Sequence, residues 1–417
     1  MRLIRYGTFL ACSLINRGAV GTVADASSRR VAAVVPQAAA VIPRATLRAA
    51  MATREGTWRY RERFGDAFGR TYFRRFGPGV ASSVGIGTYL GDPTDAVDDR
   101  YRESIRLALE SGVNHVDTAS NYRCGRSERV VGEALSEAAV DRESVVVASK
   151  AGFVPFDGER PDDPAAYVRE EFLETGILSA DDLVHGSHAI APGFIETMLD
   201  RSLDAIGVET IDCYYVHNPE TQLAERSPEE VYDALETAFE RLERRRLAGD
   251  IGGYGVATWD AFRVPPDHDS ALSLPAIIER AERAAATVGA DDHGFRAVQL
   301  PFNVRMADAF TRPTQPTSSA DADRCSLLER AHKAGVDVVT SASLGQGSLA
   351  EPGAIPEPIA DQLAGETPAQ RAINFARSAP GVTTALVGAR DPDHVRENVA
   401  AGTFDPLGAN AFDAVFE

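Results

Sequence analysis

The feature that most constrains the fold of this chain is a regular alternation of short apolar runs with amphipathic segments, from Val84 to Ala401. Eight apolar runs occur, and each is followed by a segment with helical periodicity. Apolar runs without a polar face, joined by crossover helices, are typical of parallel strands covered on both faces. Eight such units predict a closed (β/α)8 TIM barrel rather than a doubly wound sheet.

The boundaries of the predicted elements follow from where these patterns begin and end. The predicted strands are Val84–Thr88, Asn114–Asp117, Ser144–Ser149, Thr210–Val216, Ile251–Val256, Ala297–Leu300, Val336–Ser341 and Thr383–Val387. The predicted helices are Tyr101–Ser111, Ser127–Glu137, Pro192–Ile206, Pro228–Leu247, Pro275–Thr287, Cys325–Ala334, Pro368–Ser378 and Pro392–Ala401. Before the first strand, Gly77-Pro78-Gly79 predicts the turn of a short N-terminal hairpin.

The first fifty residues differ in composition from the rest of the chain. They are rich in Ala and Val, and Met51 opens a charged segment of ordinary composition. We therefore expect residues 1–50 to be an extension without stable structure, or to lie upstream of a natural start at Met51. Residues 71–402 are expected to form the barrel and residues 403–417 a C-terminal tail.

An alternative interpretation of the N-terminus is export. Two early arginines and the apolar run Thr8–Ile15 loosely resemble a signal peptide, with a weak lipoprotein-type cleavage site at Cys12. The run is short for such a peptide and far too short to span a bilayer. We therefore expect no membrane association.

The charge balance excludes one large class of function. The formal net charge is −18, which leaves no basic face to follow the phosphates of a nucleic acid. Lysine occurs only at Lys150 and Lys333. A salt-loving source and an acidic protein from a GC-rich genome account equally for this composition. The four cysteines are widely spaced and lack metal-binding spacing, which predicts free thiols in the cytoplasm and no metal site.

Polar residues stand at the ends of successive predicted strands. Asp117 ends the second strand, Lys150 the third and His217 the fourth, while Gln299 lies on the sixth. In a (β/α)8 barrel the C-terminal ends of the strands meet at one mouth, where the chemistry takes place. We therefore expect these side chains to converge there, together with Tyr122 from the turn after the second strand.

Each of these residues also has a purely structural interpretation. Asp117 could cap a turn, Tyr122 could be a half-buried packing aromatic, and His217 could be a structural histidine. Lys150 is harder to explain in this way, because it follows the apolar run VVVAS in a chain that otherwise almost avoids lysine. Something at that position needs an ammonium that arginine does not supply.

The segment DTASNYRCGRSERVVGEAL resembles the aldo-keto reductase signature D-T-A-x-x-Y-G-x-G-x-S-E. The residues in register are Asp117, Tyr122, Gly125, Ser127, Glu128 and Gly132, and the departure is Arg123 in place of glycine. VVVASK, SLDAIGVETIDCYYVHNPE and ALVGARDPDHVRENV resemble the lysine strand, the histidine strand and the C-terminal cofactor segment of that family. The resemblance covers roughly residues 71–402 and implies an NAD(P)(H)-dependent reductase of aldehydes and ketones.

The side chains themselves suit carbonyl reduction. A phenol near neutral pH is protonated but is a reluctant acid, with a pKa of about 10. We expect the ammonium of Lys150 to lower the pKa of Tyr122 by about 1–3 and Asp117 to hold that ammonium in place. His217 is expected to orient the carbonyl oxygen and stabilise developing charge. The resemblance implies the same four catalytic roles.

The resemblance also implies a set of cofactor contacts. Gln299 and Thr258 would hold the nicotinamide carboxamide, and Ser341 stands where many relatives stack a tyrosine. The remaining implied contacts are Leu344, Gly347, Gly388, Arg390, His394, Glu397 and Asn398. Backbone N–H groups near Leu344 and Gly347 would face the phosphates. Arg390 would pair with the 2′-phosphate, which favours NADP(H), while His394 leaves NAD(H) open.

Two other functions remain open from the sequence. One is a non-catalytic barrel that binds nicotinamide nucleotide as a redox-sensing or regulatory subunit, as some relatives associated with ion channels do. The other is a cofactor-free isomerase or lyase on the same fold. The small-molecule carbonyl substrate would be selected by the loops Phe153–Pro192, Trp259–Ser273 and Ser348–Thr367, whose sequences reveal neither its identity nor the oligomeric state.

Overall fold

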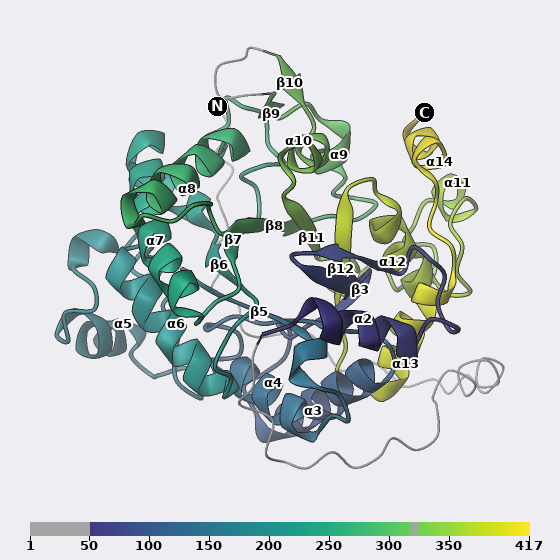
Figure 1. Ribbon diagram of the computed structural model, residues 1–417, viewed down its shortest axis with the longest axis horizontal. Coiled ribbons are helices and arrows are strands. Elements are labelled where there is room, and N and C mark those ends of the chain that lie inside the picture. The colour runs from purple at the N-terminus through teal and green to yellow at the C-terminus, as the bar shows by residue number, and fades with distance from the viewer. Residues whose placement is uncertain (1–50, 318–322) are drawn as a thin grey trace.

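The computed structural model describes residues 51–317 and 323–417, and within these two stretches eight parallel strands form a closed barrel. The strands follow the chain around the ring in the order β3-β4-β5-β6-β7-β8-β11-β12, and β12 pairs with β3 to close it. Figure 1 shows the strands at the centre of the molecule and the long helices around them. The predicted (β/α)8 TIM barrel is confirmed.

Each barrel strand is followed by a helix that packs on its outer side. The barrel strands are β3 (Val84–Gly87), β4 (His115–Asp117), β5 (Val146–Ala151), β6 (Cys213–His217), β7 (Tyr254–Ala257), β8 (Phe295–Pro301), β11 (Asp337–Ser341) and β12 (Val382–Gly388). The helices are α3 (Asp95–Glu110), α4 (Arg126–Glu137), α6 (Pro192–Ile206), α7 (Pro228–Ala248), α8 (Leu274–Val288), α10 (Leu327–Ala334), α12 (Pro368–Ser378) and α13 (Pro392–Ala400).

Shorter elements decorate this framework. They are α2 (Arg54–Arg63), the hairpin β1 (Phe73–Phe76) and β2 (Gly79–Ser82), α5 (Pro164–Val168), α9 (Asp308–Thr311), the ribbon β9 (Gln315–Pro316) and β10 (Arg324–Cys325), α11 (Glu357–Ala360) and α14 (Ala409–Asp413). The predicted turn at Gly77-Pro78-Gly79 is confirmed, since Phe76 pairs with Gly79 across it.

The sequence contains the signals that begin and end these helices. In α7, Ser227 and Glu230 form a reciprocal capping box around Pro228, which satisfies N–H groups that an isolated helix end leaves unpaired. The same helix ends at Gly249, whose φ of +92° lies in the left-handed region that glycine adopts at helix ends. Local sequence therefore fixes where α7 starts and stops.

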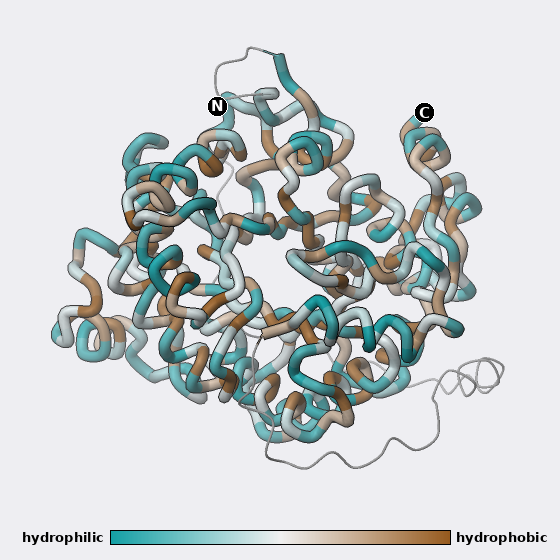
Figure 2. Tube along the Cα trace, in the orientation of Figure 1, coloured by the Kyte–Doolittle hydropathy of each residue, from teal (hydrophilic) through white to brown (hydrophobic). Residues whose placement is uncertain are grey.

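The apolar core has two parts on opposite sides of the strands. The larger lies between the barrel wall and the helices, and in Figure 2 the helices alternate between brown and teal along their turns. The smaller lies inside the barrel, where Tyr215, Ala297 and Val339 pack with Phe76 and Ala81 of the hairpin. The hairpin thus fills the N-terminal end of the barrel, which leaves the C-terminal end for chemistry.

Some predicted boundaries were wrong by a few residues. The strand expected at Ser144–Ser149 begins at Val146, because Arg142–Ser144 form a 3-10 turn before the ladder with β4 starts. The strand expected at Thr210–Val216 begins at Cys213 for a similar reason, since continuous pairing with β5 starts only there. In both cases the predicted segment begins before the residue at which a neighbouring strand becomes available for pairing.

The folded body extends on both sides of the range 71–402. Tyr60 and Phe64 of α2 are buried in the main core, and so is Phe412 of α14, which packs on Phe302 and Phe375. Residues 403–417 therefore cover part of the core. The expectations for residues 1–50, including the site at Cys12, lie outside the described residues.

Candidate active site

The structure brings the four strand-end residues together at the C-terminal mouth of the barrel. Asp117 is the last residue of β4, His217 is the last residue of β6, and Lys150 is the penultimate residue of β5. Strand register places Lys150 opposite Tyr215 and His217 opposite Ala257, the partner of Gln299. The polar side chains thus come from the C-terminal halves of neighbouring strands, although the register does not pair Asp117, Lys150 and His217 directly.

Lys150 and Asp117 form a buried ion pair. The Lys150 side chain is fully buried, and its Nζ donates to Asp117 Oδ1 at 2.5 Å and to the Thr118 carbonyl oxygen at 2.7 Å. The second carboxylate oxygen, Oδ2, accepts from Gln299 Nε2 at 2.8 Å. Burial lowers the pKa of Lys150 and raises that of Asp117, and the attraction between the two charges opposes both shifts.

Tyr122 lies over this pair. The Lys150 Nζ is 5.0 Å from the centre of the phenol ring, and the half-buried ring packs edge-on against Tyr89 at 5.0 Å and His217 at 5.9 Å. Burial, the Asp117 carboxylate and Tyr89 raise the pKa of Tyr122 well above its ordinary value. The expected net lowering of this pKa is therefore wrong, because burial of the phenol is the largest effect and the Asp117 carboxylate adds to it. Tyr122 therefore stays protonated at neutral pH.

His217 is neutral and its tautomer can be inferred. Burial, followed by Lys150 and His188, lowers the pKa of His217 well below its usual range. Its Nδ1 is buried and has no hydrogen-bond partner among the described residues. A buried N–H without an acceptor costs about 1–3 kcal/mol, so the proton belongs on Nε2. An imidazole in this state can donate one hydrogen bond to a ligand at the mouth.

The turn after Tyr122 has an unusual backbone. Arg123 and Cys124 have φ angles of +50° and +56°, in a region that residues other than glycine seldom adopt. The Arg123 guanidinium is buried, forms an ion pair with Asp98 and donates to the Asp92 carbonyl oxygen at 3.2 Å. The arginine that departs from the family signature therefore attaches this turn to the loop after β3.

Sequence reasoning missed several residues that shape the site. Tyr89 stands two residues after the end of β3, so its position near a strand end was a usable signal. Glu220 is buried, and its Oε1 accepts from the N–H groups of Trp259 and Asp260 at 2.6 and 3.1 Å, which holds the loop beyond Thr258. No local pattern pointed to this contact across two loops.

The residues expected around the nicotinamide lie on three strands of the mouth. Thr258 follows β7, and its hydroxyl lies 3.5 Å from the Gln299 carbonyl oxygen. The Gln299 amide donates to Asp117, so Gln299 is joined to the ion pair. Ser341 is the half-buried last residue of β11.

The expected phosphate contacts lie in the loop that follows β11. Leu344 is half-buried, and Gly347 is exposed with a φ of +92°. The preceding loop supports this one, since Asn303 Nδ2 donates to the Ala342 carbonyl oxygen at 2.8 Å and Arg305 Nη1 to Ser348 Oγ at 3.2 Å. The glycine turn is therefore exposed and fixed by contacts with the neighbouring loop.

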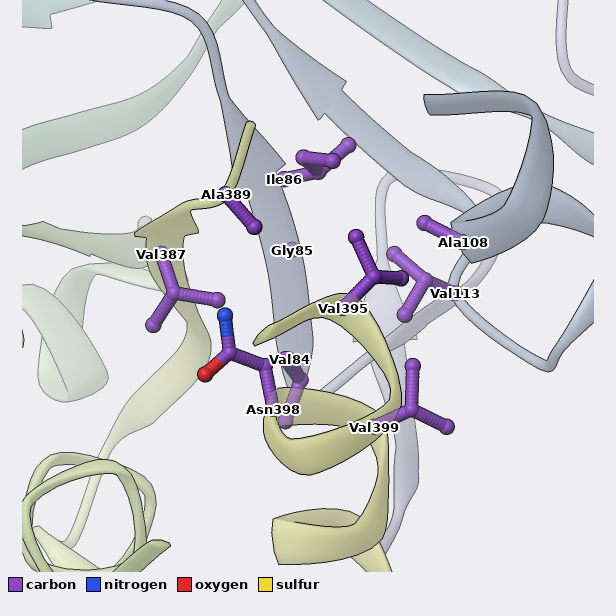
Figure 3. Close-up of a pocket in the computed structure, with 10 residues that line it drawn as sticks. All are labelled: Val84, Gly85, Ile86, Ala108, Val113, Val387, Ala389, Val395, Asn398 and Val399. Atoms are coloured by element: carbon purple, nitrogen blue, oxygen red, sulfur yellow. The ribbon is translucent and has the colours of Figure 1, made fainter. Parts of the chain in front are cut away.

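The expected adenosine contacts divide into exposed and buried positions. The exposed ones are Gly388, Arg390 and His394, and Glu397 is half-buried. Asn398 is buried: its amide points from α13 toward the barrel strands, into a cavity of about 10 Å³ that Val84, Val387 and Val395 help to line (Figure 3). This cavity has room for one water and lies outside the mouth. Arg390 and His394 are therefore accessible from solvent, whereas Asn398 is not.

The described residues place two further limits on the site. In residues 51–317 and 323–417, no group of three or more His, Cys, Asp or Glu side chains is arranged to hold a metal ion. Over the same residues, every helix is too short or too polar to cross a bilayer.

Comparisons with known proteins agree with this geometry. The family model described as "Aldo/keto reductase family" matches residues 83–265. A protein of Schizosaccharomyces pombe named a putative voltage-gated potassium channel subunit beta is 25% identical over 336 residues, which cover 78% of this chain and 85% of that protein.

Two solved structures show the same barrel. One is an aldo-keto reductase from Bacillus halodurans in its holo form, with a TM-score of 0.54 and 20% identity over 82% of this chain and 95% of that one. The other is an aldo/keto reductase from Klebsiella pneumoniae in complex with NADP and acetate, with a TM-score of 0.51 and 18% identity over 82% of this chain and 94% of that one. Residues 83–265 thus match the aldo-keto reductase family model, and they do so with signature residues in register on a barrel of the same kind.

Proposed function

We propose that this protein is an NADP(H)-dependent oxidoreductase that reduces an aldehyde or ketone to the alcohol, with Tyr122 as the proton donor. The observation that carries the proposal is the buried Lys150–Asp117 pair beneath a half-buried phenol, with neutral His217 at the edge of the same ring. An ammonium below the ring stabilises the phenolate that forms when the proton leaves.

The four side chains divide the reaction between them. His217 donates from Nε2 to the carbonyl oxygen and so fixes the orientation of the substrate. Tyr122 transfers its hydroxyl proton to that oxygen as negative charge develops. Lys150 stabilises the resulting phenolate, and Asp117 keeps Lys150 charged and in place. When bound, NADPH supplies the hydride that adds to the carbonyl carbon.

The cofactor proposal rests on charge and shape at the rim. Arg390 and His394 are exposed near the start of α13, where a 2′-phosphate would meet a guanidinium, and this supports NADP(H) over NAD(H). The Klebsiella pneumoniae relative was solved with NADP, which supports the same choice. We also propose that the protein acts in the cytoplasm on small molecules, without a nucleic-acid or membrane partner.

The walls of the mouth favour an uncharged, partly aromatic substrate. The rings of Tyr89, Tyr122, Phe153 and His217 form a chain of edge-on contacts at separations of 5.0 to 5.9 Å. Aromatic surfaces of this kind bind flat apolar groups through offset and edge-to-face packing. An aromatic aldehyde is therefore the first substrate to test.

The test is to mix the purified protein with NADPH and an aromatic aldehyde and to follow the loss of dihydronicotinamide absorbance. Tyr122→Phe should lower kcat by about 10²–10⁴, because a positioned general acid contributes that much, while Kd for NADPH stays nearly unchanged. Tyr72→Phe, next to the N-terminal hairpin, removes a buried tyrosine hydroxyl outside the mouth and is the matched control, with kcat preserved. Equal activity of Tyr122→Phe and wild type would remove Tyr122 from the acid role.

A second candidate is a regulatory barrel that binds nicotinamide nucleotide without efficient turnover. The name of the Schizosaccharomyces pombe relative, a potassium channel subunit, favours it. Fluorescence titration with NADPH separates the candidates: tight binding without reduction of any aldehyde supports the regulatory function. An absence of binding would instead support a cofactor-free isomerase or lyase.

A further inference from the structure

A buried histidine outside the four mouth residues lies directly behind His217. His188 belongs to the long segment between β5 and α6, and it is completely buried. One ring nitrogen, Nε2, lies 2.8 Å from the carbonyl oxygen of His217, and the other, Nδ1, lies 2.7 Å from Nε2 of Gln222. The imidazole thus bridges the end of β6 and the 3-10 helix Pro219–Ala224 that follows it.

These contacts determine where the proton of His188 is. The Gln222 amide nitrogen is also 3.1 Å from the carbonyl oxygen of His188, which can only accept, so this nitrogen is a donor. Nδ1 of His188 therefore accepts, and Nε2 carries the hydrogen that the His217 carbonyl oxygen receives. Burial lowers the pKa of His188 to about 4, in agreement with a neutral ring.

The His188 side chain donates to a β6 carbonyl oxygen that lies past the end of β5. β5 ends at Ala151, whereas β6 continues to His217, so the His217 carbonyl oxygen lies beyond the last strand residue of its neighbour. The next residue, Gly152, leaves room for this arrangement. A Cβ there would lie 2.3 Å from the His217 carbonyl oxygen and 3.0 Å from His188 Nε2.

The ring of Phe153 joins the two imidazoles. Its centre is 4.8 Å from that of His188 and 5.3 Å from that of His217, and both contacts are edge-on. His217 is therefore held on its backbone by a hydrogen bond from His188 and on its side chain by a ring that also packs on His188. Few other groups can fix its imidazole, since Nδ1 has no partner in the described part of the chain.

We propose that His188 is a positioning residue for His217, with Gln222 selecting the tautomer that makes this possible. The Nε2–H of His188 fixes the His217 carbonyl oxygen, and with it the direction in which the His217 imidazole leaves the strand. The expected effect on catalysis rests on the proposed function, in which His217 binds the carbonyl oxygen, whereas the contacts of His188 do not depend on it. Misplacement of a reacting group by 1 Å can cost about 100-fold in rate.

The first test replaces His188 by residues of similar size. His188→Phe should lower kcat by about 10–100-fold, with Kd for NADPH within roughly twofold of wild type. His188→Gln retains an N–H donor and should restore most of kcat, which a purely space-filling role does not predict. His332→Phe, at an exposed position of α10, is the control and should behave as wild type. An unchanged kcat in His188→Phe would overturn the proposal.

The second test does not depend on activity. Long-range ¹H–¹⁵N correlation spectra of protein labelled at histidine, assigned by the loss of a signal in His188→Gln, should show His188 as the neutral Nε2–H tautomer at pH 7. In Gln222→Met, which leaves the His188 ring in place, the Nδ1–H form should appear and kcat should fall. A wild-type Nδ1–H tautomer would refute the proposal. If wild type reduces no aldehyde, the proposed function fails, while the tautomer still decides the role of His188.

Discussion

The buried ion pair allows a quantitative prediction, because the chain contains a natural control for it. Lys150 and Lys333 are the only lysines, and each is paired with one carboxylate, Asp117 and Glu329 respectively. The first pair is almost completely buried, whereas the side chains of the second are 54% and 52% exposed. The two pairs have similar N–O distances, 2.5 and 2.6 Å, so burial is the main variable.

The magnitudes follow from this difference in burial. At an effective dielectric constant of 20, two unit charges 2.5 Å apart attract by about 7 kcal/mol, which roughly offsets a desolvation cost of several kcal/mol for each ion. Removal of one partner leaves the other charge buried and unpaired, so Lys150→Met and Asp117→Asn should each destabilise by about 3–5 kcal/mol. The double variant removes both charges and should cost much less than the sum, with a coupling of at least about 3 kcal/mol.

The assay is urea unfolding at pH 7.5 for the wild type, both single variants and the double variant, followed by circular dichroism. The same cycle with Lys333→Met and Glu329→Gln should give a far smaller coupling, because water and salt screen this exposed pair. Additive effects of Lys150→Met and Asp117→Asn would refute the reasoning. A coupling no larger than that of the exposed pair would have the same consequence.

Three other predictions concern the rim of the site. Arg123→Gly relieves a strained φ of +50° but removes the buried guanidinium that anchors the loop after β3, so the amide hydrogens of that loop should exchange faster; unchanged exchange would exclude the anchor role. Burial raises the pKa of Glu220 from 4.5 to about 7, so the folded state retains a proton that the unfolded state has lost, and stability should fall as the pH rises from about 4.5 to about 7. In Glu220→Gln, the free energy of unfolding measured with urea should fall by up to about 3 kcal/mol less over this pH range. An identical pH dependence in the variant and the wild type would contradict this prediction. Arg390→Ala should raise Kd for NADPH about tenfold and leave Kd for NADH nearly unchanged in fluorescence titrations, whereas equal losses would exclude a contact with the 2′-phosphate.

The repeat of the apolar pattern along the sequence was sufficient to predict the barrel architecture. Eight apolar runs separated by amphipathic segments leave few alternatives to a closed parallel barrel, and strand-end positions selected Asp117, Lys150 and His217 for the mouth. These inferences succeed because parallel strands all point the same way, so a residue at the end of one strand must lie near the ends of its neighbours.

The hydrogen bonds that hold the site residues in place could not be predicted from the sequence. His188 lies 29 residues before the carbonyl oxygen that it binds, and Glu220 holds N–H groups 39 and 40 residues away. The pKa of Tyr122 was predicted in the wrong direction for the same reason, since it depends first on the burial of the phenol and then on the Asp117 carboxylate beside it.

The sequence by itself determined the barrel and the residue types at its mouth, because hydrophobic periodicity and chain direction act locally and repeat along the chain. Only the tertiary structure decided the protonation states and the orientation of the side chains. Burial and hydrogen bonds between distant loops set both, and such contacts depend on three-dimensional distances that carry no signature in the order of residues.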